Sequence, residues 1–248
     1  MPIVNVLLIS LNTLVFLYEL QLGGLGLVAG SSNLQINLFF FRWGFIPDEL
    51  THGVAHHCLP GFRPCIDITS PVPTLATIFS SMFIHGSLLH FGGNMLFLWV
   101  FGDNIEDWLG HSKYLLFYLL TGAIAALSQL AISPYSDTPL IGASGAISGV
   151  LGAYLVLYPF NRIRVLLLFI FITVARIPAI VMLGVWILLQ VYNGLGSVGT
   201  TQQAGVAHFA HIGGFLAGVV IIIFYKLFTR KPARESPHRA PWDYRYRG

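Results

Sequence analysis

Long apolar stretches, separated by short polar segments, occupy most of this chain. A helix needs about 20 predominantly apolar residues to cross the hydrocarbon core of a bilayer. Six stretches approach or meet that length, and we expect each to be a transmembrane helix: residues 3–22, 74–101, 113–132, 142–159, 177–193 and 204–228. The pattern predicts an all-α polytopic membrane protein, a bundle of six transmembrane helices.

Two further features of the pattern leave alternatives. Residues 163–176 are also apolar, but Arg176 and Pro178 interrupt the stretch. We expect this segment to lie in the membrane interface or to lead at a tilt into the fifth span, with a seventh span as the less favoured alternative. The first span ends without a small-residue cleavage site, so we expect it to remain as a helix and not to be removed as a signal peptide.

The composition excludes a soluble domain. Hydrophobic residues make up 55% of the 248 residues, charged residues make up only 9%, and the mean hydropathy is +0.74. Such a chain has too few polar residues to cover a surface in water. We therefore expect the lipid bilayer and other membrane proteins as partners. The net charge of +3 is explained by membrane orientation and anionic headgroups, so we expect no nucleic acid.

Basic residues predict the orientation of the six spans, which place both termini on one side. Basic residues gather on that side, in two short connections and in the tail: Lys113, Arg162, Arg164, Lys226, Arg230, Lys231, Arg234, Arg239, Arg245 and Arg247. The opposite side holds Arg42, Arg63 and at most Arg176. Cytoplasmic loops carry an excess of Lys and Arg, so we expect both termini in the cytoplasm. The short chain without a large extramembrane domain suggests the bacterial plasma membrane.

We expect one membrane domain over residues 1–228 and a disordered, basic cytoplasmic tail over residues 229–248, which is rich in Pro and Arg. An outer loop, residues 23–73, joins the first two helices and is too long for a turn. Within it, residues 39–47 combine aromatic side chains with one Arg, which suits the headgroup layer. This segment is either a surface loop or a structured insertion that shapes access from the side of the bundle.

The outer loop contains both cysteines, Cys58 and Cys65. A disulfide is plausible if that side of the membrane is oxidising. The neighbouring His56 and His57 make a zinc site conceivable, but the spacing matches no standard zinc motif. We expect no metal and no cofactor.

Two polar residues in apolar runs are the candidates for chemistry: Ser144 at the start of the fourth span and His211 in the sixth. Burying a polar group in hydrocarbon without a partner costs about 2 to 7 kcal/mol, so each of these side chains needs a partner. A helix N-terminus at Ser144 supplies free N–H groups and a positive dipole end, which favour an alkoxide and a developing oxyanion. The G-x-S-x-G motif of soluble hydrolases is not matched, because position 146 is Ala.

Small residues line one face of each of these two spans: Gly145, Gly149 and Ala153 in the fourth, Gly214 and Gly218 in the sixth. Such residues let membrane helices pack at backbone contact. Close approach is needed because a serine oxygen must lie about 2.6 to 3.2 Å from a histidine nitrogen. His211 shares the glycine face, whereas His208 points about 60° away, so we prefer His211 as the base. The alternative is a packing serine bonded to its own helix.

The second span carries His90 and Asn94, four residues apart on one helix face. An Asn amide offers two donors and a neutral His offers one, which suits the binding of a tetrahedral oxyanion. Hydrogen-bonded packing is the alternative for His90, and it is the preferred interpretation of His85.

These motifs together resemble the rhomboid family of intramembrane serine proteases. The resemblance covers about residues 36–225 and rests on G-A-S-G at 142–145, H-x-x-x-N at 90–94, A-H-x-x-G-x-x-x-G at 210–218, the stretch 101–107 and the segment 43–47. It implies a six-helix fold with Ser144 as nucleophile and His211 as general base. It also implies that Asn94, His90 and the backbone N–H of Ser144 hold the oxyanion.

One departure from the family is visible, since some members carry an aromatic residue that packs on the catalytic His where this chain has Ser148. His211 must therefore be oriented by another group. Glu19 is the only carboxylate well inside a predicted span, and we expect it near the interface. A dyad without a third acid follows.

The function we expect is cleavage of single-pass transmembrane substrates that enter sideways and unwind locally. One alternative is a catalytically inactive rhomboid-like protein that binds membrane clients. Such relatives usually lack the Ser or the His, and this chain has both. A transporter would need charged groups at mid-membrane and two similar halves, and neither is present in the sequence.

Overall fold

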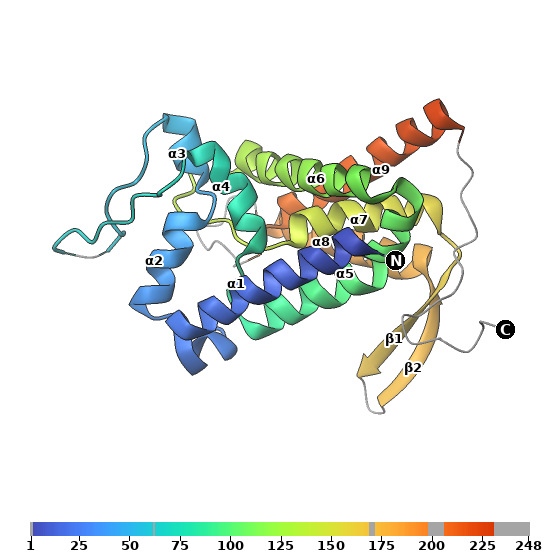
Figure 1. Cartoon of the computed structure of the whole chain (residues 1–248), viewed down its shortest axis with the longest axis horizontal. Coiled ribbons are helices and arrows are strands. Elements are labelled where there is room, and N and C mark those ends of the chain that lie inside the picture. Colours follow the sequence, from blue (N-terminus) through green and yellow to red (C-terminus); the bar gives the residue numbers. More distant parts are fainter. Residues whose placement is uncertain (1, 62, 169–171, 198–205, 231–248) are drawn as a thin grey trace.

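The computed structural model describes residues 2–61, 63–168, 172–197 and 206–230. In chain order the elements are α1 (Ile3–Val28), α2 (Leu34–Trp43), α3 (Pro47–His52), α4 (Thr74–Ser80), η1 (Ser81–Phe83), α5 (Leu88–Leu109), α6 (His111–Ile132), α7 (Ser144–Leu157), β1 (Arg162–Leu168), β2 (Ile172–Pro178), α8 (Ala179–Ser197) and α9 (His208–Thr229). Figure 1 shows a bundle of long helices, from which the outer loop and a hairpin extend at opposite ends. The predicted class, a helical membrane bundle, is confirmed.

The six predicted stretches all contain helix, but they do not all have the length of a complete span. Four helices of the described chain, α1, α6, α8 and α9, are long and apolar enough to cross a membrane individually. The pair formed by α4–η1 and α5 makes a fifth span if it is counted as one. The remaining stretch, the predicted fourth span, contains α7, a shorter apolar helix of 14 residues in the centre of the bundle.

The predicted second span, residues 74–101, is wrong as a single helix. The chain breaks after η1 and bends by 84° before α5 begins at Leu88. Ser87 causes the restart, because its side chain accepts a hydrogen bond from the backbone N–H of His90 at 3.1 Å and so caps α5. The helix then continues past Phe101 to Leu109.

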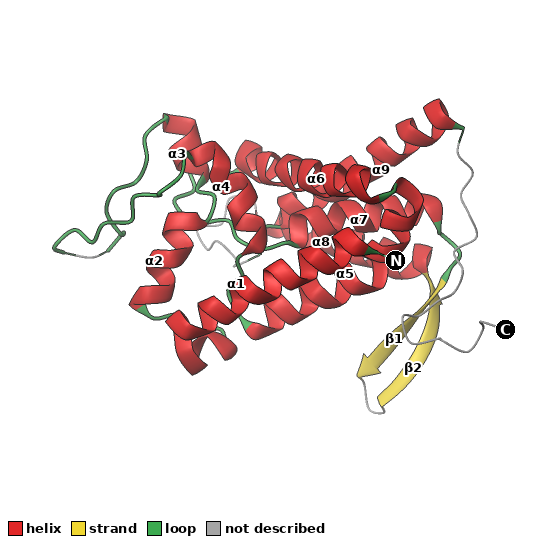
Figure 2. Cartoon of the chain, in the orientation of Figure 1, coloured by secondary structure: helices red, strands yellow, loops and turns green. Residues whose placement is uncertain are grey.

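Residues 163–176 contain no helix in the described part of the chain, so a helical seventh span is wrong for this segment, whereas its location in the membrane interface stays a prediction. This segment forms an antiparallel hairpin in which β1 pairs with β2, from Arg162 opposite Pro178 to Leu168 opposite Ile172 (Figure 2). The segment is rich in β-branched residues, which favour strands. The hairpin leads directly into α8 at Ala179.

The helix α7 lies at the centre and packs against α5, α6 and α9. Ten of its 14 residues are buried. The predicted glycine seam is present, because side chains at Gly214 and Gly218 would collide with the carbonyl oxygens of Gly145 and Gly149. The backbones of α7 and α9 therefore touch, as the small residues predict.

Two carboxylates attach α1 to its neighbours. Near its start, Glu106 of α5 accepts hydrogen bonds from the backbone N–H groups of Val4 (2.9 Å) and Asn5 (2.7 Å). Near its other end, Glu19 accepts the backbone N–H of His85 at 3.0 and 3.2 Å. The side chain of Glu19 is fully buried and satisfies a backbone group freed by the break before α5. Its expected depth near the membrane interface stays a prediction.

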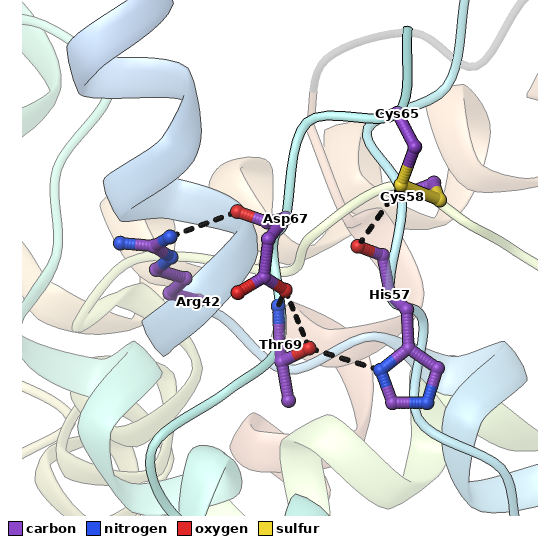
Figure 3. Close-up of a disulfide and its surroundings, with 6 residues drawn as sticks. All are labelled: Arg42, His57, Cys58, Cys65, Asp67 and Thr69. Atoms are coloured by element: carbon purple, nitrogen blue, oxygen red, sulfur yellow. Dashed lines mark hydrogen bonds between the residues drawn. A yellow bond between two sulfur atoms is a disulfide. The ribbon is translucent and has the colours of Figure 1, made fainter.

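The outer loop is structured by α2, α3 and a disulfide between Cys58 and Cys65 (Figure 3). Beside the disulfide, Arg42 donates a hydrogen bond from Nη2 to the backbone oxygen of Asp67 at 2.8 Å. The hydroxyl of Thr69 donates to the carboxylate of Asp67 and lowers its pKa. The expected tail, residues 229–248, lies outside the described residues from position 231 onward.

Candidate active site

A cavity of about 580 Å³ lies where α4, η1 and the helices α5 to α9 converge. All four residues that the sequence singled out line it: Ser144, His211, His90 and Asn94. They come from three different helices, so the fold brings together side chains up to 121 positions apart in sequence, from His90 to His211. Both Ser144 and His211 are only partly buried and are therefore accessible from the cavity.

Ser144 is the first residue of α7, as predicted. The residue before the helix is Ala143, whose side chain cannot accept a hydrogen bond from the first turn. Gly142 adopts φ 123°, a conformation that favours glycine, and a Cβ atom there would lie 2.7 Å from Nε2 of His90. A hydrogen bond to η1 stabilises this turn, because the N–H of Gly142 donates to the backbone oxygen of Ser81 at 2.9 Å. This geometry presents Ser144 to the cavity beside His90.

The hydroxyl oxygen of Ser144 lies 2.7 Å from Nε2 of His211. The backbone contact of α7 with α9 makes this distance possible, since a serine side chain is short. A neutral imidazole that accepts the serine hydrogen at Nε2 can act as its base. The pairing of the two spans is therefore present as the sequence predicted.

The other two predicted residues present hydrogen-bond donors. The N–H of Gly86 donates to Nδ1 of His90 at 3.4 Å, which leaves the hydrogen of the neutral ring on Nε2, the atom next to Gly142. Asn94 is 7% exposed, and its Nδ2 has no partner among the described residues. A buried amide without a partner is costly, which suggests that a ligand oxygen completes it.

The sequence analysis missed Gln190 of α8. Its Oε1 lies 3.0 Å from Nδ1 of His211 and 2.8 Å from Nδ1 of His208. One turn earlier, the Trp186 ring lies 6.0 Å from the His211 ring. The signal was available, because a lone Gln in an apolar span requires a polar partner.

Three neighbouring residues have other contacts. Ser148, at the position where some family members have an aromatic residue, donates its hydroxyl to the carbonyl oxygen of Ser144 at 2.6 Å. His208 contacts Gln190 and not Ser144, in agreement with the choice of His211. His85 is fully buried, and its ring centroid lies 5.5 Å from that of Phe91 and 5.1 Å from that of His90.

In the described part of the chain, no group of three or more His, Cys, Asp or Glu could hold a metal ion.

The outer loop supports the turn that precedes Ser144. Phe45 and Leu140 exchange two backbone hydrogen bonds, of 3.1 and 2.7 Å. Phe45, Ile46 and Pro47 are buried, so this part of the segment 39–47 is a structured insertion and not a surface loop.

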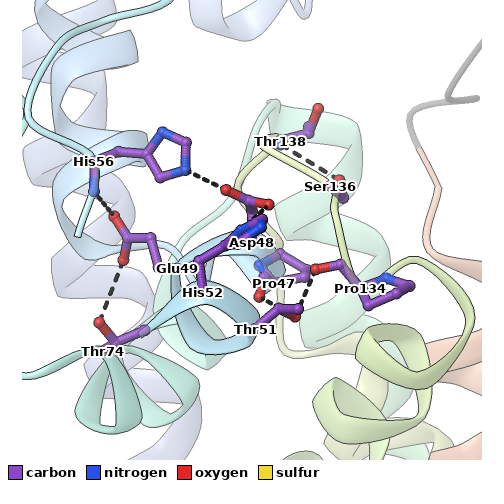
Figure 4. A network of polar contacts seen from close by, with 10 residues as sticks. All are labelled: Pro47, Asp48, Glu49, Thr51, His52, His56, Thr74, Pro134, Ser136 and Thr138. Atoms are coloured by element: carbon purple, nitrogen blue, oxygen red, sulfur yellow. Dashed lines mark hydrogen bonds and ion pairs between the residues drawn. The ribbon is translucent and has the colours of Figure 1, made fainter. Parts of the chain in front are cut away.

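A second support comes from α3 (Figure 4). The backbone N–H of Asp48 donates a hydrogen bond to the backbone oxygen of Ser136 at 3.0 Å. The hydroxyl of Thr51 donates a hydrogen bond to the backbone oxygen of Pro134 at 2.6 Å. The carboxylate of Asp48 also accepts from His56 (2.9 Å) and His52 (2.8 Å), and the bond from His56 is the main reason that the pKa of Asp48 is lowered. The outer loop thus braces the connection from α6 to α7.

Comparisons with known proteins identify relatives of this chain. A family model described as the Rhomboid domain matches residues 73–228. Rhomboid protein 1, mitochondrial, of Saccharomyces cerevisiae is 32% identical over 154 residues, which are 60% of this chain and 41% of that protein. The Presenilin-associated rhomboid-like protein, mitochondrial, of Bos taurus is 30% identical over 155 residues, 58% of this chain and 36% of that protein.

A bacterial relative, Rhomboid protease GluP of Bacillus subtilis, is 39% identical over 79 residues, which are 32% of this chain and 15% of that protein. The chain thus matches less than half the length of each of these relatives. Since the yeast and bovine proteins are mitochondrial, the comparisons do not support the bacterial plasma membrane that the sequence led us to expect. The match to the Rhomboid domain and the apolar helices show that this chain is a multi-pass membrane protein.

Proposed function

Because this chain belongs to the rhomboid family, we propose that it is a serine endopeptidase that cuts transmembrane segments of membrane proteins inside the bilayer. The observation that carries the proposal is the 2.7 Å contact between Oγ of Ser144 and Nε2 of His211. The same cavity is lined by Asn94, whose Nδ2 has no hydrogen-bond partner among the described residues. An inactive relative that only binds clients has no need of this contact.

The proposed reaction begins with attack of the Ser144 oxygen on the scissile carbonyl carbon, while His211 takes the hydroxyl proton on Nε2. The negative charge moves to the carbonyl oxygen. Donors for that oxygen are Nδ2 of Asn94, the Nε2–H of His90 and the backbone N–H of Ser144. When the tetrahedral intermediate collapses, the C–N bond breaks and the His211 proton passes to the leaving amine. Water then hydrolyses the acyl-enzyme through the same base.

The proposed substrates are single-pass transmembrane proteins that enter the bundle from the side. A peptide bond is open to attack only where the substrate helix is unwound, and unwound backbone is tolerated in a membrane only against protein or water. The cavity of about 580 Å³ supplies such a place. We expect small residues at the cleavage site and Gly or Pro nearby, and both termini of this chain on the cytoplasmic side.

The test is covalent labelling with a fluorophosphonate probe, together with cleavage of a model single-pass substrate in liposomes. Wild-type protein should be labelled and should cleave, whereas Ser144→Ala should lose at least about 10³-fold in cleavage and all labelling. The matched control is Ser148→Ala, which removes a hydroxyl one turn away that is bonded to its own helix. This control should stay within about threefold of wild type. Cleavage that persists in Ser144→Ala would refute the proposal, and a folded wild type without labelling would favour the client-binding alternative.

A further inference from the structure

We infer that Gln190 is a positioning residue that holds His211 in the tautomer and orientation needed to accept the serine proton. The inference rests on the proposed function. It starts from the arrangement in which one amide oxygen on α8 contacts the Nδ1 atoms of two histidines on α9, at 3.0 Å for His211 and 2.8 Å for His208.

The chemistry of the amide oxygen decides where the hydrogens lie. A carbonyl oxygen is only an acceptor and has two lone pairs, so it can take one hydrogen from each ring. Each Nδ1 must then carry a hydrogen. A neutral His211 with its hydrogen on Nδ1 has a bare lone pair on Nε2, 2.7 Å from the Ser144 hydroxyl. The serine can donate to that lone pair and later transfer its proton there.

The opposite amide orientation would give an inactive site. If the NH₂ group of Gln190 pointed at the two rings, each Nδ1 would accept, and the hydrogen of His211 would lie on Nε2 facing the serine oxygen. His211 would then have no free lone pair for the serine proton. Only the arrangement with the oxygen toward the histidines allows both His211 and Ser144 to perform the proposed reaction.

The location of Gln190 explains why an amide can replace a carboxylate here. Its helix, α8, is largely apolar, with only three of its 19 residues buried, and an ionised side chain in such a segment is costly. An amide provides the same acceptor without a charge. Trp186, one turn earlier on the same helix, has its ring centroid 6.0 Å from that of the His211 ring. Both groups stand in for the aromatic residue that is absent at Ser148.

The test compares two substitutions of nearly equal size. Gln190→Glu keeps an oxygen acceptor, whereas Gln190→Met has the length of Gln without a strong acceptor. We expect Gln190→Met to lower the fluorophosphonate labelling rate about 100-fold, because the imidazole is free to adopt the wrong tautomer. Gln190→Glu should stay within about tenfold of wild type. A control, His208→Ala, removes the second ring from the same oxygen and should stay within about threefold, because the bond to His211 remains.

The thermal unfolding temperature of each variant in the same detergent separates positioning from folding. A merely structural role predicts that labelling falls in step with stability, and that Met and Glu behave alike. The inference is overturned if Gln190→Met is labelled as fast as wild type, or if the labelling rates of Gln190→Met and Gln190→Glu fall by the same factor. Labelling is compared well below the lowest unfolding temperature. If folded wild type shows no more labelling than Ser144→Ala, the proposed function itself fails, which is a different result.

Discussion

The two helices that carry Ser144 and Gln190 are packed very differently. In α7, ten of 14 residues are buried, and the backbone touches α9 through glycines. In α8, three of 19 residues are buried: Ala179, Leu183 and Gly194. Ser144 is thus held by the interior of the bundle, whereas Gln190, which contacts His211, lies on a helix with few buried residues. We therefore expect the stability of the protein to depend mainly on the packing of α7. We expect the proposed proteolysis to depend on both α7 and α8.

The most severe test of this contrast is a side chain in the glycine seam. Gly218→Val should lower the free energy of unfolding by about 3 kcal/mol or more, because the new Cβ would collide with the backbone carbonyl of Gly149, which cannot move aside. The control is Gly184→Ala in α8, where, apart from the adjacent residues and the backbone of the helix itself, no atom of the described residues lies within 4 Å of the added Cβ. It should change stability by no more than about 0.5 kcal/mol. Equal stabilities in a detergent unfolding assay would break the comparison.

A smaller effect is expected from the few contacts that anchor α8. Leu183 is fully buried, and Leu183→Ala should cost about 2 to 4 kcal/mol because it leaves a cavity. Leu188 is 67% exposed on the same helix, and Leu188→Ala should cost less than about 0.5 kcal/mol. Thermal unfolding of both variants measures how far the anchoring of α8 depends on single positions. A uniform cost along α8 would show that this helix is packed as continuously as α7.

The smallest effect concerns α3 of the outer loop, which supports the connection from α6 to α7 through hydrogen bonds. Hydrogen bonds, chiefly from His56, hold the pKa of Asp48 below its ordinary value of 3.8. A lowered pKa in the folded state adds stability above that ordinary value, and the contribution disappears as the pH falls through the lowered pKa. We therefore expect Asp48→Asn to unfold at a slightly lower temperature than wild type at pH 6. The difference should vanish in the most acidic buffers, and a difference that grew with acidity would contradict the assignment.

The sequence alone was sufficient for the residues that meet in the cavity. Ser144 and His211 are polar groups in apolar runs, and the four-residue spacing of glycines indicated which faces touch. Their 2.7 Å contact is consistent with these two facts, because backbone contact is needed to bring so short a side chain within reach. His90 and Asn94 were found in the same way, from helical spacing and donor chemistry.

Other features depend on contacts between distant segments, which periodicity does not reveal. The break before α5 needs the Ser87 cap and a carboxylate from α1, and neither changes the apolar pattern of residues 74–101. The hairpin at 162–178 arose from a stretch whose apolar content fits a helix or a strand equally well. Gln190 was visible in the sequence, but its partners lie in another helix, 18 and 21 positions later.

The two carboxylate attachments of α1 fix the position of α5 along α1. Glu19 and the Val4–Asn5 pair lie about 22 Å apart along the axis of α1. Glu19 accepts a hydrogen bond from His85, and Val4 and Asn5 donate to Glu106, so the two attachments hold opposite ends of the segment 85–106. If α5 slid along α1, it would have to give up both attachments together. The first helix, α1, therefore holds His90 and Asn94 at a constant position along its own axis.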